Sequence, residues 1–418
     1  MGRLDFVLKA RRRDDPKTTT RYRATTSARI KYRTDIDGLR ALAVVSIVVF
    51  HLNPSALRGG FIGVDIFFVI SGFLIIGIIQ HELQIGTFSL SEFYAKRCRR
   101  ILPAMFFMLL VCSGAAWCLL LPSELVDFSK SLASASVYAS NIYFYFLIDY
   151  FRNSNAEALV HTWSLGVEEQ FYLVIPIALF VAFKLTRRAA LPLLYAIRLL
   201  SFAIGWYLTR HDPSAAFYLV PARMWQFCCG GICAICAAPR FRGIALSAIA
   251  AAALIGLVSS VWLIDGAMAF PGYLALLPTI SCAALLWTGR DSGTLVSRTL
   301  SVPPLRFFGT ISDSMYLFHW PIIVFYKVAV SPDLNGREQF WLFAASTLAG
   351  TLSFVGVELP TRKIAINDFP FRWIAGGGAA SAIFCAMAGA CIAYRGVPGT
   401  VTTCCTRHGV LSRLSRGR

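Results

Sequence analysis

The stretch GLRALAVVSIVVFHL, residues 38–52, is an apolar run of the kind that crosses membranes, yet it carries Arg40 near one end and His51 near the other. Along a helix the two lie roughly 16 Å apart, at about 1.5 Å per residue. At about 100° per residue they also share one helix face. Charged groups in hydrocarbon are costly, so both are candidate functional residues. The plain alternative is a snorkelling Arg and a His that only packs.

Apolar runs of similar length recur along the whole chain. Of the 418 residues, 56% are hydrophobic and only 15% are charged, with a mean hydropathy of +0.61; soluble domains carry about 25% charged residues. The runs are 38–55, 60–80, 101–121, 165–183, 189–208, 217–238, 243–263, 270–288, 311–331, 339–357 and 371–394. They predict an all-α, polytopic integral membrane protein with a ten-helix bundle and one additional C-terminal transmembrane helix.

The Lys/Arg bias of the loops predicts the orientation. With the N-terminus cytoplasmic and 122–164 kept as an outer segment, partly re-entrant, the inner loops carry 15 Lys/Arg and the outer loops carry 5. If 132–148 spanned the membrane instead, every later loop would change side and the bias would reverse.

The net charge of +18 does not indicate nucleic-acid binding, because the positive charges sit at the ends of the apolar runs. The 12 cysteines lie mostly inside those runs, where Cys acts as a small hydrophobe. The CCGGICAIC segment, 228–236, contains a C-x-x-C, but its Gly-rich apolar setting favours helix packing. We expect no metal and no bound cofactor.

Two groups of polar residues are predicted to lie near His51, toward the outer side. Asp65 enters the second helix at a matching depth, where a His–Asp pair would fix the imidazole tautomer; the alternative is a structural Asp that pairs with an Arg. HTWSLGVEEQFYL, 161–173, offers further candidates. These are His161, Trp163, Glu168 and Glu169, to which His319 of YLFHWP is added as a residue that packs or lines the outer half.

A basic cluster marks the opposite, cytoplasmic side. Lys96, Arg97, Arg99 and Arg100 stand immediately before the third predicted helix. They serve either as a positive-inside anchor or as a clamp for phosphate, which Arg binds bidentately. Cations inside and a His with carboxylates further out suit acyl-coenzyme A as donor, with its phosphates at the cluster and its thioester reaching His51. His51 would then act as general base on an acceptor hydroxyl.

Five co-linear motifs over about residues 30–360 resemble the membrane-bound acyltransferase family 3, the O-antigen acetylase-like and nodulation-factor acetylase-like O-acyltransferases. They are YRTDIDGLRALAVVSIVVFH, GGFIGVDIFFVISGFLI, FYAKRCRRILPAM, HTWSLGVEEQFYLVIP and SDSMYLFHWP. The resemblance implies an enzyme of the bacterial inner membrane. It would transfer an acyl group, usually acetyl from acetyl-CoA, to hydroxyls of lipopolysaccharide, exopolysaccharide or a similar glycan.

The resemblance also assigns roles to residues. The family's Arg-x10-His motif falls on Arg40 and His51, and its Arg-x-Arg motif falls on Arg97 and Arg99. Its buried acidic residue matches Asp65, and its Ser-Leu-x-x-Glu motif gives Glu168. One departure is RMWQ, 223–226, where relatives often have Arg-x-Trp-Glu.

The predicted organisation is a basic arm at 1–34, the acyltransferase domain at 35–360, an eleventh helix at 371–394 and an atypical tail at 395–418. Long relatives carry an outer SGNH-type hydrolase-like domain after this helix, and we expect it to be missing here. We therefore predict an O-acetyltransferase. The alternatives are a transporter or flippase of acyl or sugar donors, or a non-catalytic truncated component of polysaccharide assembly.

Overall fold

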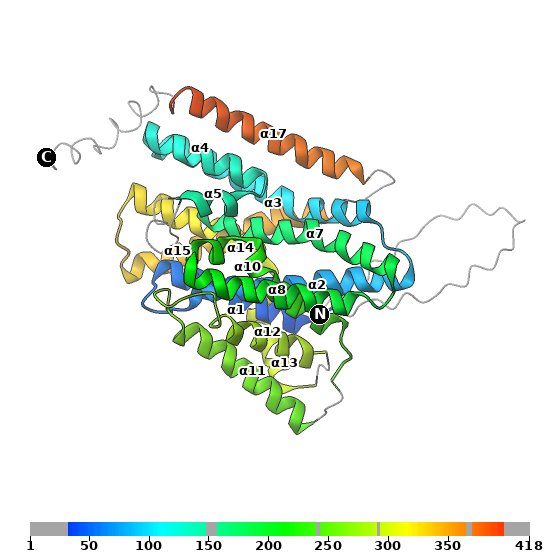
Figure 1. Ribbon diagram of the computed structural model, residues 1–418. Helices are drawn as coiled ribbons and strands as arrows, with labels where there is room; N and C mark the ends of the chain where they lie inside the picture. The colour runs from blue at the N-terminus through cyan, green and yellow to red at the C-terminus, as the bar shows by residue number, and fades with distance from the viewer. Residues whose placement is uncertain (1–31, 148–156, 240–242, 291–292, 365–369, 397–418) are drawn as a thin grey trace, which may run out of the picture. The chain divides into compact units, whose positions relative to one another are not determined.

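The computed structural model describes residues 32–147, 157–239, 243–290, 293–364 and 370–396. The predicted basic arm and C-terminal tail lie almost wholly outside the described residues. Within them every regular element is a helix (Figure 1), so the predicted all-α class is confirmed.

The elements follow one another along the chain with these bounds: α1 (Thr34–Leu52), η1 (Gly60–Ile62), α2 (Gly63–Ile85), α3 (Leu90–Leu119), α4 (Pro122–Ser136), α5 (Ser140–Leu147), η3 (Val160–Thr162), α7 (Trp163–Leu185), α8 (Ala190–His211), α9 (Pro213–Tyr218), α10 (Val220–Ile235), α11 (Ile244–Leu263), α12 (Leu276–Thr288), α13 (Leu295–Leu300), α14 (Pro303–Ala329), α15 (Gly336–Ser353), η4 (Phe354–Glu358), α16 (Leu359–Lys363) and α17 (Phe371–Ala393).

Each of the eleven predicted apolar runs falls on a helix. By length and composition alone, seven helical segments among the described residues are able to cross a membrane: Gly60–Ile85, Leu90–Leu119, Val160–Leu185, Ala190–His211, Ile244–Leu263, Gly336–Lys363 and Phe371–Ala393. The other four runs fall on α1 and α14, which carry charged side chains, and on α10 and α12, which have 16 and 13 residues.

The third helix begins earlier than the hydropathy predicts. The predicted run starts at residue 101, whereas α3 starts at Leu90, because the Ser89 hydroxyl caps it by accepting from the backbone N–H of Glu92. Hydropathy marks only the lipid-facing part of a helix. The basic cluster therefore lies within the first three turns of α3 and not before it, so helical periodicity decides which arginines share a face.

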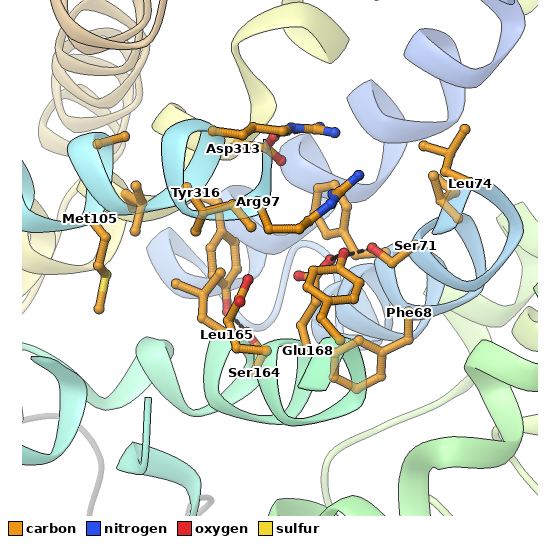
Figure 2. A pocket seen from close by; sticks show the side chains of 18 of the residues that line it. Phe68, Ser71, Leu74, Arg97, Met105, Ser164, Leu165, Glu168, Asp313 and Tyr316 are labelled. Atoms are coloured by element: carbon orange, nitrogen blue, oxygen red, sulfur yellow. Dashed lines mark hydrogen bonds and ion pairs between the residues drawn. The ribbon is translucent and has the colours of Figure 1, made fainter. Parts of the chain in front are cut away.

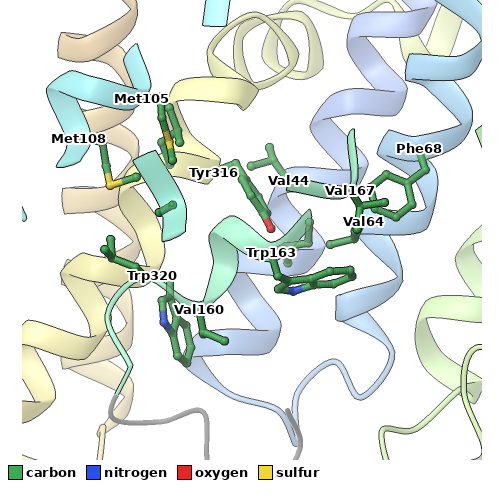
Figure 3. Packing of buried hydrophobic residues seen from close by; sticks show 14 of the residues in the cluster. Val44, Val64, Phe68, Met105, Met108, Val160, Trp163, Val167, Tyr316 and Trp320 are labelled. Carbon is green, nitrogen blue, oxygen red and sulfur yellow. The ribbon is translucent and has the colours of Figure 1, made fainter. Parts of the chain in front are cut away.

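The centre of the fold is formed where α1 meets α14 and α2, and where α2 meets α10 (Figure 1). The α2–α10 contact is backbone against backbone: a Cβ at Gly72 would collide with the carbonyl of Phe227, and one at Gly230 with that of Val69. Aromatic and aliphatic side chains from several helices then fill the middle, among them Phe68, Trp163 and Tyr316 in Figure 3.

The segment between α3 and α7 enters the bundle and turns back. α4 runs antiparallel to α17 (Figure 1): Leu125 lies opposite Cys391, whereas the carbonyl of Ser136 accepts from Ser381 Oγ at 2.7 Å. α4 therefore covers only about half of α17. α5 leads back, and its Tyr145 hydroxyl donates to Asp212 Oδ2 at 2.9 Å, at the end of α8. Residues 148–156 lie outside the described part of the chain.

Candidate active site

Two cavities meet α1, one near each end. The Arg40 cavity is lined by side chains from α1, α2, α3, α7, α14 and η4, and the centre of a water molecule can occupy about 90 Å³ of it. The His51 cavity is lined by the end of α1 and η3, by α14, and by residues of the loops 53–59, 264–269 and 332–338. The Lys/Arg bias assigns these three loops to the outer side, so α1 carries its cation and its imidazole to different cavities.

Arg40 is held firmly in its cavity. Its guanidinium forms an ion pair with Asp313 of α14 at 2.5 Å, and its Nε donates to Ser312 Oγ at 3.0 Å. The other carboxylate oxygen of Asp313 lies 3.4 Å from Arg100. Asp313 thus bridges the cation of α1 and one of the α3 cations. Sequence reasoning missed it, although a charged residue inside a predicted span was a usable signal.

Glu168 lies in the Arg40 cavity, on the α7 wall. The hydroxyls of Ser71 and Tyr172 both donate to its Oε1. Figure 2 shows Ser71 joined to Glu168 by a dashed line, with Arg97 above them in this view. The guanidinium of Arg97 also lies 5.3 Å from the centre of the Tyr172 ring. A carboxylate, two hydroxyls and a cation therefore converge from three helices.

This placement differs from the prediction for the carboxylates of α7. Glu168 and Glu169 were expected at the depth of His51, but both line the Arg40 cavity. The reason is local: residues 158–164 are buried beside the re-entrant segment, so α7 starts inside the bundle and not at its surface. Two further turns of helix carry the carboxylates to the opposite side.

The Arg-x-Arg pair is split by the helix. Arg97 and Arg100 line the Arg40 cavity, whereas Arg99 donates from its guanidinium to the carbonyl of Ile364. Residues two apart on a helix point about 200° apart, and residues three apart share a face. Arg99, which we expected to bind the donor, is therefore not on the cavity wall, where Arg97 and Arg100 lie together.

His51 lies beside two residues of α14. Its Nδ1 is 2.9 Å from Nε2 of His319, and its ring centroid is 4.6 Å from that of Trp320. His161 lines the same cavity and is only 2% exposed. The structure thus brings together His51, His161 and His319, as the motifs indicated. Trp163 lines neither cavity; it is 1% exposed and packs against Phe217.

Asp65 does not form the expected pair with His51. It is fully buried, 3.2 Å from Arg223, and it accepts from the amide of Gln226. The guanidinium of Arg223 lies within 5.5–5.7 Å of four aromatic ring centroids, those of Phe68, Trp163, Phe217 and Phe270. The contact between Gln226 and Asp65 also explains why RMWQ has Gln226 where relatives often have Glu: the amide donates to Asp65, whereas a carboxylate would repel it.

One hydrogen-bonded layer separates the two cavities. Tyr316 lines the Arg40 cavity, and its hydroxyl donates to the carbonyl of His161, which lines the His51 cavity. Ser164 Oγ lies 2.7 Å from the same hydroxyl. Tyr316 therefore links the wall of the Arg40 cavity to that of the His51 cavity. Among the described residues no three His, Cys, Asp or Glu side chains are grouped to hold a metal ion.

Comparisons with known proteins identify the family of this chain. An acyltransferase domain profile (Acyl_transf_3) matches residues 33–357. BcsY of Komagataeibacter xylinus, whose name describes a membrane-bound transacylase, is 34% identical over 78% of this chain and 82% of its own length. The O-acetyltransferase OatA of Staphylococcus aureus is 30% identical over 82% of this chain, and the peptidoglycan O-acetyltransferase OatA of Listeria monocytogenes is 32% identical over 83%.

The matched region spans only 59% and 57% of the two OatA proteins. No solved structure matches this chain. Because the profile covers more than three quarters of the chain and its curated relatives are named as acyl-transfer enzymes, the chain belongs to acyltransferase family 3 and is a multi-pass membrane acyltransferase.

Proposed function

We propose that this protein is an O-acetyltransferase of the bacterial inner membrane that moves an acetyl group from acetyl-CoA to a hydroxyl of a cell-surface glycan. The proposal depends on one observation: the two ends of α1 line different cavities, with Arg40 in one and His51 in the other. The names of the OatA relatives support O-acetyl transfer, and that of the Listeria protein supports a glycan acceptor.

The Arg40 cavity suits the donor. Arg40, Arg97 and Arg100 line it together with four carboxylates, those of Glu168, Glu169, Asp313 and Glu358. With the charges nearly balanced, we assign the neutral pantetheine arm to the cavity, with its thioester end extending past Tyr316 toward His51. The phosphates of the donor would stay at its mouth, near the basic turns of α3. Glu168 would accept an N–H from the pantetheine amides.

The His51 cavity suits the acceptor, because the loops that border it are those assigned to the outer side. His51 would take the proton of the acceptor hydroxyl as that oxygen attacks the thioester carbonyl. A C–O ester bond forms and the C–S bond breaks, and the imidazolium returns the proton to the departing sulfur. The products are an O-acetylated glycan and coenzyme A, and His51 is regenerated.

The test compares cells that lack the gene with cells complemented by the wild type or by His51→Ala. Proton NMR measures the O-acetyl content of the surface polysaccharide, and immunoblots measure membrane insertion. We expect wild type to restore the acetyl signal and His51→Ala to leave it at least about a hundredfold lower, as loss of a general base would. An acetyl signal restored equally by His51→Ala would contradict the proposal and favour transport, which does not require one imidazole.

A further inference from the structure

The ring of a general base must be held in one orientation and one tautomer, and Asp65 does not do this for His51. We propose that His319 is the positioning residue: it accepts a hydrogen bond from His51 Nδ1 and so leaves the lone pair of His51 on Nε2, the nitrogen that removes the acceptor's proton. This inference rests on the proposed function for its chemical meaning, although the tautomer itself can be measured without it.

The argument begins with the partner of His319. Its Nδ1 lies 2.6 Å from the carbonyl oxygen of Tyr316, one turn earlier on α14. A carbonyl only accepts, so Nδ1 of His319 must carry the hydrogen. A neutral imidazole has one N–H, which makes Nε2 of His319 an acceptor. His319 is fully buried, so the packing around it holds this ring in place.

The tautomer of His319 in turn determines that of His51. Nε2 of His319 lies 2.9 Å from Nδ1 of His51, and the two ring planes differ by 15°. Because that Nε2 is an acceptor, Nδ1 of His51 must be the donor. The lone pair of neutral His51 then resides on Nε2. A backbone carbonyl of α14 thus fixes the tautomer of a side chain on α1 through one intervening imidazole.

The hydrogen bond from His51 to His319 plays the same part as one from a catalytic His to a carboxylate, but His319 carries no charge. A carboxylate holds the tautomer and also stabilises the imidazolium, whereas His319 does only the first. His161 supplies a comparison within the same cavity. Its Nε2 lies 3.0 Å from the carbonyl of Leu317, so it must hold its own hydrogen on Nε2, the opposite tautomer to that inferred for His51.

Two substitutions separate orientation from packing. In His319→Gln the side-chain oxygen can still accept from His51 Nδ1, and the amide NH₂ can still donate to Tyr316. In His319→Phe a flat aromatic ring is kept and both hydrogen bonds are lost. His211→Gln, at the exposed end of α8, is the matched control.

The first readout is the initial rate of [¹⁴C]acetyl incorporation from acetyl-CoA into membranes isolated from the cells that express each variant. We expect His319→Phe to lower the maximal rate about a hundredfold with an unchanged KM for acetyl-CoA, as loss of base function would. His319→Gln should stay within about tenfold of wild type, since it keeps the acceptor. Equal rates for the Phe and Gln variants would overturn the assignment.

The second readout does not depend on transfer. Solid-state NMR of ¹⁵N-histidine-labelled protein in liposomes reports the tautomer of His51, assigned by comparison with His51→Gln. We expect the Nδ1–H tautomer in wild type and in His319→Gln, and its loss in His319→Phe. An Nε2–H tautomer in wild type would overturn the inference even if acetyl transfer is confirmed. The expected tautomer with no acetyl transfer would instead disprove the proposed function alone.

Discussion

Among the Asp–Arg ion pairs of the described residues, Asp65–Arg223 and Arg40–Asp313 have opposite surroundings. Asp65 and Arg223 are both 1% exposed, lie 3.2 Å apart and line neither the Arg40 cavity nor the His51 cavity. Arg40 and Asp313 are 2.5 Å apart with side chains 12% and 42% exposed, and both face the Arg40 cavity. Only the second pair can meet a substrate.

The comparison shows that a charged residue inside a predicted span has two different meanings. A pair sealed among aromatic rings joins helices, here α2 and α10, and removal of one partner strands a charge in a dry environment. A pair on a cavity wall is partly solvated and can exchange its partner for a ligand. Sequence alone marks both Asp65 and Arg40 as candidates, and only their surroundings tell them apart.

The largest effect is expected at the sealed pair. Asp65→Asn leaves the guanidinium of Arg223 buried without its carboxylate, which costs about 3–5 kcal/mol. We expect little folded protein, measured by size-exclusion chromatography in detergent and by thermal unfolding. The matched control is Asp313→Asn, which should remain folded because Asp313 is partly exposed.

A double variant tests whether the unpaired charge causes this loss of folded protein. Asp65→Asn combined with Arg223→Gln removes both charges and should regain much of the folded protein, because no buried charge is left unpaired. If Asp65→Asn alone folds as wild type and loses only acetyl transfer, Asp65 acts in catalysis and the comparison between the two pairs fails.

A smaller effect, and one on activity, is expected at the cavity pair. Arg40→Lys keeps the charge but loses the planar fork that contacts Asp313 and Ser312 together. Hydrogen bonds to charged groups are worth about 1.5–3 kcal/mol, so transfer should fall about 10- to 100-fold. The membrane assay with [¹⁴C]acetyl-CoA measures it. The thermal unfolding midpoint should change little; a loss of folded protein equal to that of Asp65→Asn would contradict the distinction.

The helices were predictable from the sequence because lipid imposes one simple requirement, a long apolar run with its backbone satisfied internally. Every such run became a helix, and Lys/Arg bias grouped three loops that do meet at the His51 cavity. The start of α3 was not predictable by hydropathy, because its first turns are polar and are set by the cap at Ser89.

The contacts within the site were harder to predict, because depth along a helix does not specify a partner. Asp65 and His51 were matched by depth, but Arg223, 158 positions away, takes the carboxylate of Asp65. The predicted depth of Glu168 was wrong for another reason, because the re-entrant segment shifts the start of α7 into the bundle. A single sequence contains neither the rotation of a helix nor the competition between distant partners.

The smallest effect is expected within the Arg-x-Arg motif, and it separates sequence spacing from helix geometry. Arg97 lines the Arg40 cavity, whereas Arg99 contacts the carbonyl of Ile364. Arg97→Ala should raise the KM for acetyl-CoA about tenfold, roughly the worth of one charge-assisted contact. Arg99→Ala should change that KM less than about twofold, because its side chain points about 200° away.

Matched expression levels in the membrane make the two arginine variants comparable, since they differ by two positions on one helix and remove the same side chain. The positive-inside bias of the α2–α3 region falls equally in both. A general loss of positive charge at this end of α3 would therefore affect both variants alike. Equal increases in KM would mean that the donor is held by the charge of the whole cluster, and that the cavity wall formed by Arg97 and Arg100 does not select it.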